Sequence, residues 1–495
     1  MPDIGFDSRK YLNLQTTYIK ERIEKFGNKL YLEFGGKLFD DFHAQRVLPG
    51  FEADFKVRML ATMADKTEIV LVINSADIDT GKARGDSGIT YDEELLRLAD
   101  AFTGIGLYVG SVVITRYSGE KPTKQFAAHL RSLGMNVYRH YHINDYPTNA
   151  NHVLSSQGFG KNEYIKTEKP LVVVTAPGPG SGKMATCLSQ LYHENLKGVR
   201  AGYAKFETFP IWNLPINHPL NLAYESATVD LDDVNMIDPF HLEHYGETAV
   251  SYNRDIEGFT VLNAAFKKIW GESPYNSPTD MGVNMIGYCI KDDSACVYAS
   301  KQEIIRRFYN ISCDILTGRG NKSALTKMEL LMSKADTSSA DRPVIAKAKE
   351  KSLHCGTPAV AIMLPDKSFV TGKTSSLLGA SAAALLNALK VLAGIDDEHE
   401  LISPEDIVPI QKLKVGFLGN KNPRLHTDEV LIALSINSNE DKAAKAVFEQ
   451  LPKLKNSEVH STVMLSTVDI NVFKNLGMNV TCEAKYENNS LYHKR

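Results

Sequence analysis

The sequence predicts an α/β protein whose N-terminal domain is a mainly parallel, three-layer α/β sheet with a P-loop-like turn. Short apolar runs that suit buried strands alternate with segments of about ten residues that show helical spacing, which is typical of βαβ units. One such run, at 172–174, is followed at once by a glycine-rich turn and an amphipathic segment. The length of 495 residues is too great for one ordinary core, so two or three domains are expected.

The first half of the chain contains most of the strand signals. The segments TEIVLVIN (67–74) and PLVVVT (170–175) are rich in β-branched residues, as in strands covered on both faces. Residues 91–102 place leucines at helical spacing. Strands are expected at 29–34, 67–74, 107–117, 136–140 and 170–175, and helices at 91–102 and 124–133 and after residue 183.

The second half begins with a change in composition. Residues 202–282 are rich in proline, asparagine and aspartate, which predicts long irregular structure of the kind that carries sites or interfaces. Helices are expected at 258–269, 301–316 and 324–333, followed by a hairpin at 359–364 and 368–371, an alanine-rich helix within 375–395, a strand at 429–437 and a helix at 442–450. The predicted domains are therefore 1–230 (α/β), 231–340 (helical) and 341–495 (α/β).

Composition excludes several classes of protein. Hydrophobic residues make up 43% and charged residues 23%, as in a globular chain, and 56 basic against 59 acidic residues give a net charge of −3. This balance argues against a nucleic-acid or membrane-surface partner. The six cysteines form no C-x-x-C pair, and the N-terminus shows no signal pattern. The chain is therefore expected to be cytoplasmic, and a homo-oligomer is compatible with its type.

The glycine-rich turn 177–183 (PGPGSGK) is the main functional candidate. Gly178, Gly180 and Gly182, with Ser181 between them, let the backbone bend tightly and turn its N–H groups toward one point. The following helix adds its positive dipole end, and Lys183 adds a mobile positive charge. This pattern predicts a site for a small phosphorylated or anionic ligand, with ATP or another nucleotide as the candidate cofactor. The alternative is an ordinary tight strand-to-helix turn.

The match to the P-loop pattern G-x-x-x-x-G-K-[ST] is incomplete. The first glycine position holds Pro177, and the hydroxyl position holds Met184, which cannot ligate Mg²⁺. Thr186 lies two residues further on, where its hydroxyl would point around the helix. The backbone and lysine features are retained, whereas the use of Mg²⁺ and the identity of any metal ligand stay open.

A polar loop at 74–88 follows the strongest predicted strand. It holds Asp77, Asp79, Lys82 and Asp86 among glycines, at a strand end where functional groups collect. A carboxylate there could hold a metal or act as a base. Asp77 and Asp79, together with Lys183, are therefore the candidate catalytic residues, and a solvated polar loop is the alternative.

A second glycine-lysine sequence, VTGKTSS at 370–376, lies between a predicted strand and a predicted helix. Gly372, Lys373 and Thr374 are candidates for a second phosphate-binding turn, although the hydroxyls could instead cap the helix. Two further loops, 277–284 and 420–429, mix polar and charged residues. They suit a substrate pocket or, equally, ordinary solvated connections.

The chain resembles a bacterial family catalogued as domain of unknown function eighteen forty-six. The stretches that carry the resemblance are 30–51, 176–194, 216–246, 277–287, 370–389 and 422–434. The resemblance implies an N-terminal α/β domain, a helical middle and a C-terminal α/β domain, and it implies no activity. Some members carry the label ATP-dependent peptidase, but this sequence has no H-E-x-x-H, no G-x-S-x-G and no complete P-loop.

Three interpretations of function stay open. The leading one is an enzyme that binds a nucleotide or phosphorylated metabolite at the P-loop-like turn. The second is an enzyme that acts on a small anionic substrate without a nucleotide, in a pocket lined by both Lys183 and Lys373. The third is a non-catalytic scaffold in which the glycine loop is a relic.

Overall fold

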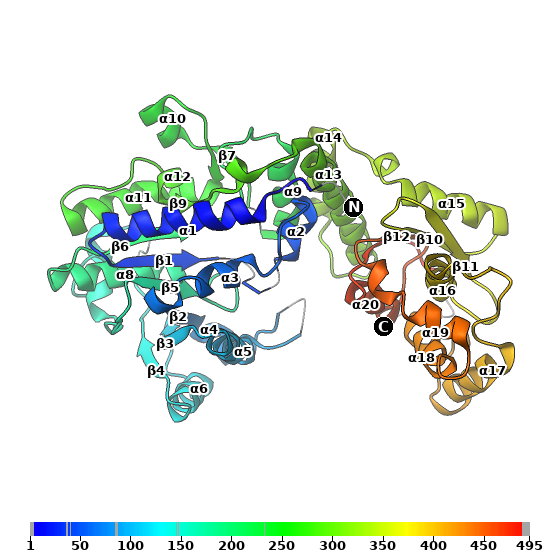
Figure 1. Cartoon of the computed structure of the whole chain (residues 1–495). Helices are drawn as coiled ribbons and strands as arrows, with labels where there is room; N and C mark the ends of the chain where they lie inside the picture. The colour runs from blue at the N-terminus through cyan, green and yellow to red at the C-terminus, as the bar shows by residue number, and fades with distance from the viewer. Residues whose placement is uncertain are drawn as a thin grey trace. The chain divides into compact units, whose positions relative to one another are not determined.

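The computed structural model describes residues 4–35, 38–39, 41–84, 88–144, 146, 148–231 and 233–487 (Figure 1). The chain divides into two compact units. Among the described residues, the N-terminal unit comprises 4–225 and 233–297, and the C-terminal unit comprises 226–231 and 298–487. The segment 231–340, which the sequence predicts as one helical domain, is therefore shared between the two units.

The N-terminal unit is built on a parallel sheet of seven strands in the order β4-β3-β2-β5-β1-β6-β9. Every strand predicted in the first half of the chain is present in it. The strands are β1 (Leu30–Phe34), β2 (Thr67–Asn74), β3 (Tyr108–Thr115), β4 (Asn136–Arg139), β5 (Leu171–Thr175), β6 (Gly202–Phe206) and β9 (Gly282–Val283). A separate antiparallel pair is formed by β7 (Asn235–Ile237) and β8 (Val250–Tyr252).

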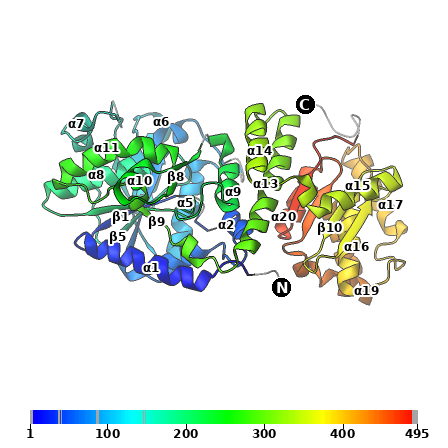
Figure 2. The same ribbon diagram turned by 90° about the horizontal axis from the view of Figure 1, so that it is seen from above.

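Helices cover both faces of the large sheet, which gives the predicted three layers. Figure 2 shows α8 and α11 on one face and α1 on the other. The central strands β1, β2 and β5 are buried along their whole length because both faces are covered. The helices are α1 (Ser8–Lys25), α2 (Phe42–Val47), α3 (Phe55–Ala61), α4 (Ser75–Asp79), α5 (Tyr91–Gly104), α6 (Lys121–Ser132), α7 (Ala150–Val153), α8 (Lys183–Leu196), α9 (Pro219–Ala227), α10 (Pro239–Tyr245), α11 (Asn253–Trp270) and α12 (Pro278–Met281).

The C-terminal unit has its own sheet, in the order β11-β10-β12-β13. The predicted hairpin is confirmed as antiparallel β10 (Ala359–Met363) and β11 (Phe369–Lys373). Side chains alternate across β10: Ala361 packs with residues of α15, whereas Val360 and Ile362 pack with residues of α16. The remaining elements are α13 (Asp293–Leu316), α14 (Lys322–Lys334), α15 (Pro343–Cys355), α16 (Ala380–Ala393), α17 (Pro404–Lys412), α18 (Thr427–Asn437), α19 (Lys442–Phe448), α20 (Thr467–Asn475), β12 (Glu458–Ser461) and β13 (Asn479–Cys482).

The strand predicted at 429–437 is wrong, because this segment is helix α18. Val430, Ala433 and Leu434 are buried at helical spacing, while Ile432 and Ile436 are exposed. The β-branched composition suggested a strand, but the burial period is that of a helix. Among the described residues, no helix has the length and apolar character needed to cross a membrane.

Candidate phosphate-binding site

The glycine-rich loop lies at the carboxyl end of β5, where the topology of the sheet changes direction. Strand β2 continues through α4 and α5 to β3, its outer neighbour. Strand β5, which pairs with β2, continues through α8 to β6, on the opposite side. The loops after these two adjacent strands therefore diverge, which is the position where open α/β sheets bind ligands.

The loop is held in shape by glycine conformations and by two hydroxyl groups. Gly180 has φ of +74° and Gly182 has φ of +90°, both in the left-handed region. The Thr115 hydroxyl at the end of β3 donates to the Ser181 carbonyl at 2.6 Å, and the Ser181 hydroxyl donates to the Gly178 carbonyl at 2.6 Å. The Ser181 hydroxyl hydrogen is therefore used inside the loop and is not available to a ligand.

Helix α8 begins at Lys183, with Gly182 as its N-cap residue. No side chain within the described part of the chain caps this end, and the first turn carries no acidic residue. The free N–H groups and the dipole of this 14-residue helix therefore favour an anion next to the loop. Lys183 is only partly buried, so its ammonium group can reach the same anion.

The structure offers little for a magnesium ion at this loop. Met184 occupies the hydroxyl position of the P-loop pattern, and Thr186 is buried with no hydrogen-bond partner for its Oγ1 among the described residues. Nor does the described part of the chain contain a group of three His, Cys, Asp or Glu side chains that could hold a metal. The loop therefore lacks the hydroxyl ligand that a P-loop gives Mg²⁺.

The polar loop after β2 lies against the glycine loop. Lys82 Nζ lies 3.1 Å from Asp77 Oδ1 and 4.9 Å from the centre of the Tyr91 ring. Tyr91 in turn packs against Gly178: a Cβ atom on this glycine would lie 2.5 Å from the tyrosine Oη. A chain of contacts thus runs from Asp77 to the loop, and the two loops singled out in the sequence are neighbours.

Asp79 has a structural role in this arrangement. Its Oδ1 accepts hydrogen bonds from the Thr123 backbone N–H at 3.2 Å and from the Thr123 hydroxyl at 2.7 Å. Its Oδ2 accepts from the Ser118 hydroxyl at 2.8 Å. Both oxygens hold the start of α6, so Asp79 is a poor candidate for a catalytic base. Asp86 lies outside the described residues.

A buried charge cluster that the sequence analysis missed lies at the end of β6. Lys205 Nζ bonds the Asp255 carboxylate and lies 3.0 Å from Glu207 Oε1. Burial disfavours the charged form of Lys205, but the two carboxylates outweigh it and raise the Lys205 pKa. Burial raises the pKa of Glu207 to about 7; the Lys205 charge opposes this shift and Asp255 reinforces it. Burial and Asp255 therefore favour the protonated form of Glu207, and Lys205 opposes it.

Glu33 lies on β1, between the strand that carries Lys205 and the strand that leads into the glycine loop. It is the register partner of Lys205 on β6 and of Val174 on β5, and its Oε2 accepts from the Tyr203 hydroxyl at 2.8 Å. Burial raises the pKa of the Cys187 thiol on α8; Glu33 raises it further and Lys183 lowers it. Both charges therefore act on one buried thiol, next to the first turn of α8.

The second glycine-lysine sequence is not a turn into a helix, contrary to the prediction. Gly372 and Lys373 are strand residues of β11, and α16 begins only at Ala380. A Cβ on Gly372 would lie 2.2 Å from the Ala384 backbone nitrogen, so this glycine allows the strand and α16 to pack closely. The N–H of the buried Thr374 donates to the Pro358 carbonyl at 2.9 Å. Gly372 and Thr374 therefore serve packing and hydrogen bonding within the C-terminal unit.

Comparison with known proteins identifies relatives over the full chain. Two family models match: "Domain of unknown function DUF1846, N-terminal" over residues 4–336, and "Domain of unknown function DUF1846, C-terminal" over 340–492. A UPF0371 protein of Streptococcus pyogenes serotype M28 (strain MGAS6180) is 54% identical over 494 residues, covering 100% of both chains. A UPF0371 protein of Streptococcus sanguinis (strain SK36) is 55% identical over 494 residues, with the same coverage. These names state no activity.

Proposed function

This chain belongs to the DUF1846 family, and we propose that it is a cytoplasmic enzyme that binds a nucleotide or phosphorylated metabolite at the glycine loop 177–183. The observation that carries the proposal is the uncapped N-terminus of α8, which opens with Lys183 behind two glycines of positive φ. The loop follows β5, and the connection after the neighbouring strand β2 leads to the other side of the sheet. This is the usual ligand position of such sheets. The six free cysteines are in keeping with a cytoplasmic location.

In this proposal the backbone N–H groups of the loop and the first turn of α8 bind the phosphate oxygens. Lys183 adds a charge-assisted hydrogen bond, which contributes about 1.5–3 kcal/mol. Such preorganised donors stabilise negative charge that develops on a reacting phosphate group. Gly180 and Gly182 are needed here for their positive φ, and Gly178 for its close contact with Tyr91.

The charge cluster supplies the acid–base chemistry of the proposed enzyme. Glu207, whose pKa burial raises, is the candidate proton donor or acceptor, and its ion pair with Lys205, which also binds Asp255, holds it in place. Glu33, the register partner of Lys205, places a further carboxylate beside the cluster on the neighbouring strand β1. Asp77, beside Lys82 and Tyr91, is the second candidate for a proton-transfer role.

A second candidate is an enzyme that acts on a small anionic substrate without a nucleotide. It is favoured by Met184 at the position where a nucleotide-bound metal would need a hydroxyl ligand. The two candidates differ in what the loop recognises. A nucleotide enzyme should prefer ATP or GTP to inorganic pyrophosphate, whereas the second candidate should bind sugar phosphates or pyrophosphate at least as tightly.

The experiment is a thermal-shift screen of the full chain against ATP, GTP, coenzyme A, pyrophosphate and sugar phosphates. A ligand at about 100 times its Kd adds roughly 2.7 kcal/mol to stability, which is readily seen as a higher Tm. Lys183→Ala should weaken the ligand found by roughly 5- to 150-fold, which corresponds to about 1–3 kcal/mol. Lys322→Ala is the matched control, because Lys322 is also the first residue of its helix, α14.

The outcomes separate the three interpretations. A ligand lost in Lys183→Ala but kept in Lys322→Ala supports a working phosphate site. A ligand that binds both variants as it binds the wild type contradicts this location. If no phosphate compound shifts the Tm, the proposal fails and a non-catalytic scaffold becomes the better account.

A further inference from the structure

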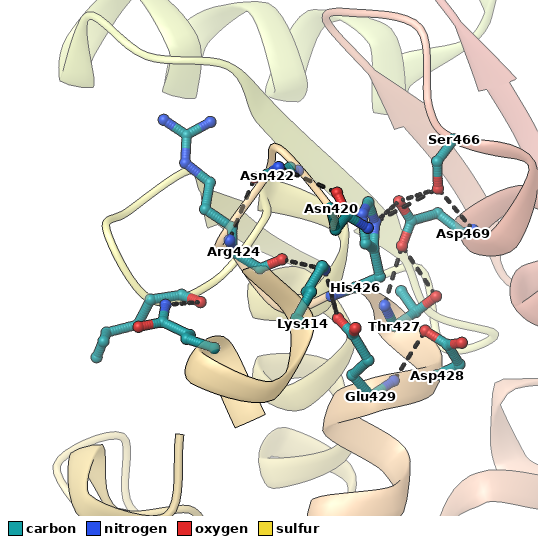
Figure 3. A network of polar contacts seen from close by, with 12 residues as sticks. Lys414, Asn420, Asn422, Arg424, His426, Thr427, Asp428, Glu429, Ser466 and Asp469 are labelled. Atoms are coloured by element: carbon teal, nitrogen blue, oxygen red, sulfur yellow. Dashed lines mark hydrogen bonds and ion pairs between the residues drawn. The ribbon is translucent and has the colours of Figure 1, made fainter. Parts of the chain in front are cut away.

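The C-terminal unit contains a histidine–aspartate pair that the proposed function does not use. His426 stands at the end of the loop 420–426, just before α18, and Asp469 lies in the first turn of α20 (Figure 3). The Nδ1 atom of His426 lies 2.9 Å from Oδ2 of Asp469. Loop 420–429 was one of the polar loops that the sequence offered as a substrate pocket.

The loop is fixed by backbone pairing with the segment before α16. The Leu425 N–H donates to the Leu377 carbonyl at 2.9 Å, and the Gly379 N–H donates to the Leu425 carbonyl at 3.1 Å. His426 therefore follows a residue that is hydrogen-bonded on both sides. A side chain held by such a frame is preorganised, which is what a reacting group needs.

Asp469 is a fully bonded, buried carboxylate. Its Oδ1 accepts from the Thr427 N–H and the Thr427 hydroxyl, both at 3.0 Å, and its Oδ2 accepts from the Ser466 hydroxyl at 2.8 Å (Figure 3). Burial disfavours its ionised form, but the hydrogen bonds from His426 and these partners outweigh burial and lower the Asp469 pKa. An ionised carboxylate only accepts hydrogen bonds, so Nδ1 of His426 carries the hydrogen.

This assignment leaves Nε2 of His426 with a free lone pair. The side chain is 20% exposed, and within the described ranges no hydrogen bond reaches Nε2. A neutral imidazole whose Nδ1–H is held by a carboxylate is fixed in orientation, with Nε2 as its acceptor nitrogen. The carboxylate also stabilises the imidazolium that forms when Nε2 takes up a proton.

Ser466 is not the nucleophile of a serine-type triad here. Its Oγ lies 3.4 Å from Nδ1, the ring nitrogen that bonds Asp469, and it donates its hydrogen to Asp469. In a triad the serine must lie at the other ring nitrogen, which takes its proton. The nucleophile at Nε2 must therefore come from outside this set, and the partial exposure of the His426 side chain admits water.

The charges around the pair favour an uncharged substrate. Lys414 is bonded to Glu429 at 2.7 Å, and Arg424 is bonded to Glu487 at 2.6 Å, so both cations are neutralised. Asp469 adds a further negative charge. A phosphate group would lack a free cation among these residues, whereas a carbonyl compound needs none in its ground state.

We propose that His426 and Asp469 form the acid–base pair of a second active site, which activates water for the hydrolysis of an ester. An O–H bond of water breaks, its proton passes to Nε2, and the oxygen electron pair forms the new bond to the carbonyl carbon. The bond from that carbon to the leaving oxygen then breaks, and the imidazolium returns its proton to that oxygen. The products are a carboxylic acid and an alcohol, and no other reactant is needed.

The first test is chemical modification of the wild-type full chain with diethyl pyrocarbonate, followed by mass spectrometry of each histidine. His354 on α15 is the reference because it is exposed, whereas His426 is mostly covered. If the pair activates Nε2, His426 should be modified at least as fast as His354 despite its lower exposure. Modification at a rate at least tenfold below that of His354 would overturn the proposal, and it needs no variant that might misfold.

The second test uses p-nitrophenyl acetate as the ester and two matched variants. In His426→Asn the amide N–H can replace Nδ1–H toward Asp469, so the Tm should stay near that of the wild type while Nε2 is removed. The rate of p-nitrophenol release should fall at least tenfold. His399→Asn alters another histidine–aspartate pair, in which Nε2 lies 3.3 Å from Asp441, and should change the rate less than twofold. A folded His426→Asn variant with the wild-type rate would show that the pair only joins α18 to α20.

Discussion

Gly178 lies so close to Tyr91 that a Cβ atom on the glycine would fall 2.5 Å from the tyrosine hydroxyl oxygen and 2.6 Å from Cζ. Tyr91 is the first residue of α5, and Lys82 lies over its ring. The glycine loop is thus packed against the segment that follows β2. Gly178 is required for this contact rather than for a special backbone angle, unlike Gly180 and Gly182.

Gly178→Ala should destabilise the protein by about 1–3 kcal/mol, as is usual for overpacking at a close contact. Tyr91→Ala should remove the clash. The double variant should therefore lose less stability than the sum of the losses in the two single variants. Urea unfolding of the four proteins gives the coupling energy. Additive losses would mean that the loop moves away from Tyr91 and that the contact is not rigid.

Gly372→Ala should damage the C-terminal unit more than Lys373→Ala does. The added Cβ would lie 2.2 Å from the Ala384 nitrogen, a backbone atom of α16 that has little freedom to move, so a loss of roughly 2–3 kcal/mol is expected. Lys373 is exposed at the strand end, and its loss should change stability by about 0.5 kcal/mol or less. Comparable effects of the two substitutions, measured by chemical unfolding, would contradict the packing account of this motif.

Lys205→Met should reveal the cost of leaving the buried carboxylates without a cation. Removal of one partner from a buried ion pair costs about 3–5 kcal/mol, so a loss of this size is expected at pH 8. The loss should shrink at pH 5, where protonation neutralises part of the carboxylate charge. The control is Arg319→Met, because Arg319 pairs with Asp314 at 3.2 Å and both side chains are exposed, at 74% and 40%; it should cost less than about 1 kcal/mol. Equal costs would show that the cluster is not a closed, buried unit.

His140 should make the stability of the protein depend on pH below neutrality. Burial lowers the pKa of His140 to about 4, whereas an unfolded histidine has a pKa of about 6.5. Between these values the unfolded chain binds the proton and the folded chain does not, so stability falls as the pH drops from about 6.5 to about 4. At pH 5, His140 therefore lowers the free energy of unfolding by about 2 kcal/mol. This is about 1.36 kcal/mol for each pH unit below 6.5.

The measurement is urea unfolding of the wild type and His140→Gln at pH 7 and pH 5. Glutamine can keep the hydrogen bond to the Glu163 carbonyl, which lies 3.2 Å from Nε2, but it cannot titrate. The difference in the free energy of unfolding between the wild type and His140→Gln should therefore change by about 2 kcal/mol between pH 7 and pH 5. The same difference at both pH values would mean that His140 titrates normally in the folded protein.

Much of the N-terminal sheet could be predicted because its strands have a simple local pattern. Runs such as residues 67–74 and 171–174 are apolar, β-branched and bounded by turns, so burial on both faces is visible in the sequence. Residues 429–437 have similar composition, yet Ile432 and Ile436 face solvent on a helix. Composition alone does not distinguish these cases, since burial is decided by tertiary packing.

The charge cluster and its neighbour Glu33 could not be predicted from the sequence, because Glu33, Lys205 and Asp255 are far apart along the chain. The available signal was a charge inside an apolar strand: Glu33 in LYLEF and Lys205 in GYAKF. A charged residue in a buried strand needs a partner, so such positions mark sites. The prediction of a second phosphate-binding turn was wrong because the sequence VTGK resembles such a turn only in its residue types. Its Gly372 is needed for close packing against Ala384.

The most direct test of the central claim is a crystal structure of the protein grown with ATP or, if ATP does not bind, with pyrophosphate. The account predicts a phosphate group within hydrogen-bond distance of the N–H groups at 180–183, with the Lys183 ammonium on the same phosphate. Asp79 should remain bonded to Thr123. A phosphate bound elsewhere, with the loop unchanged and Lys183 in solvent, would contradict the claim that this loop is the binding site.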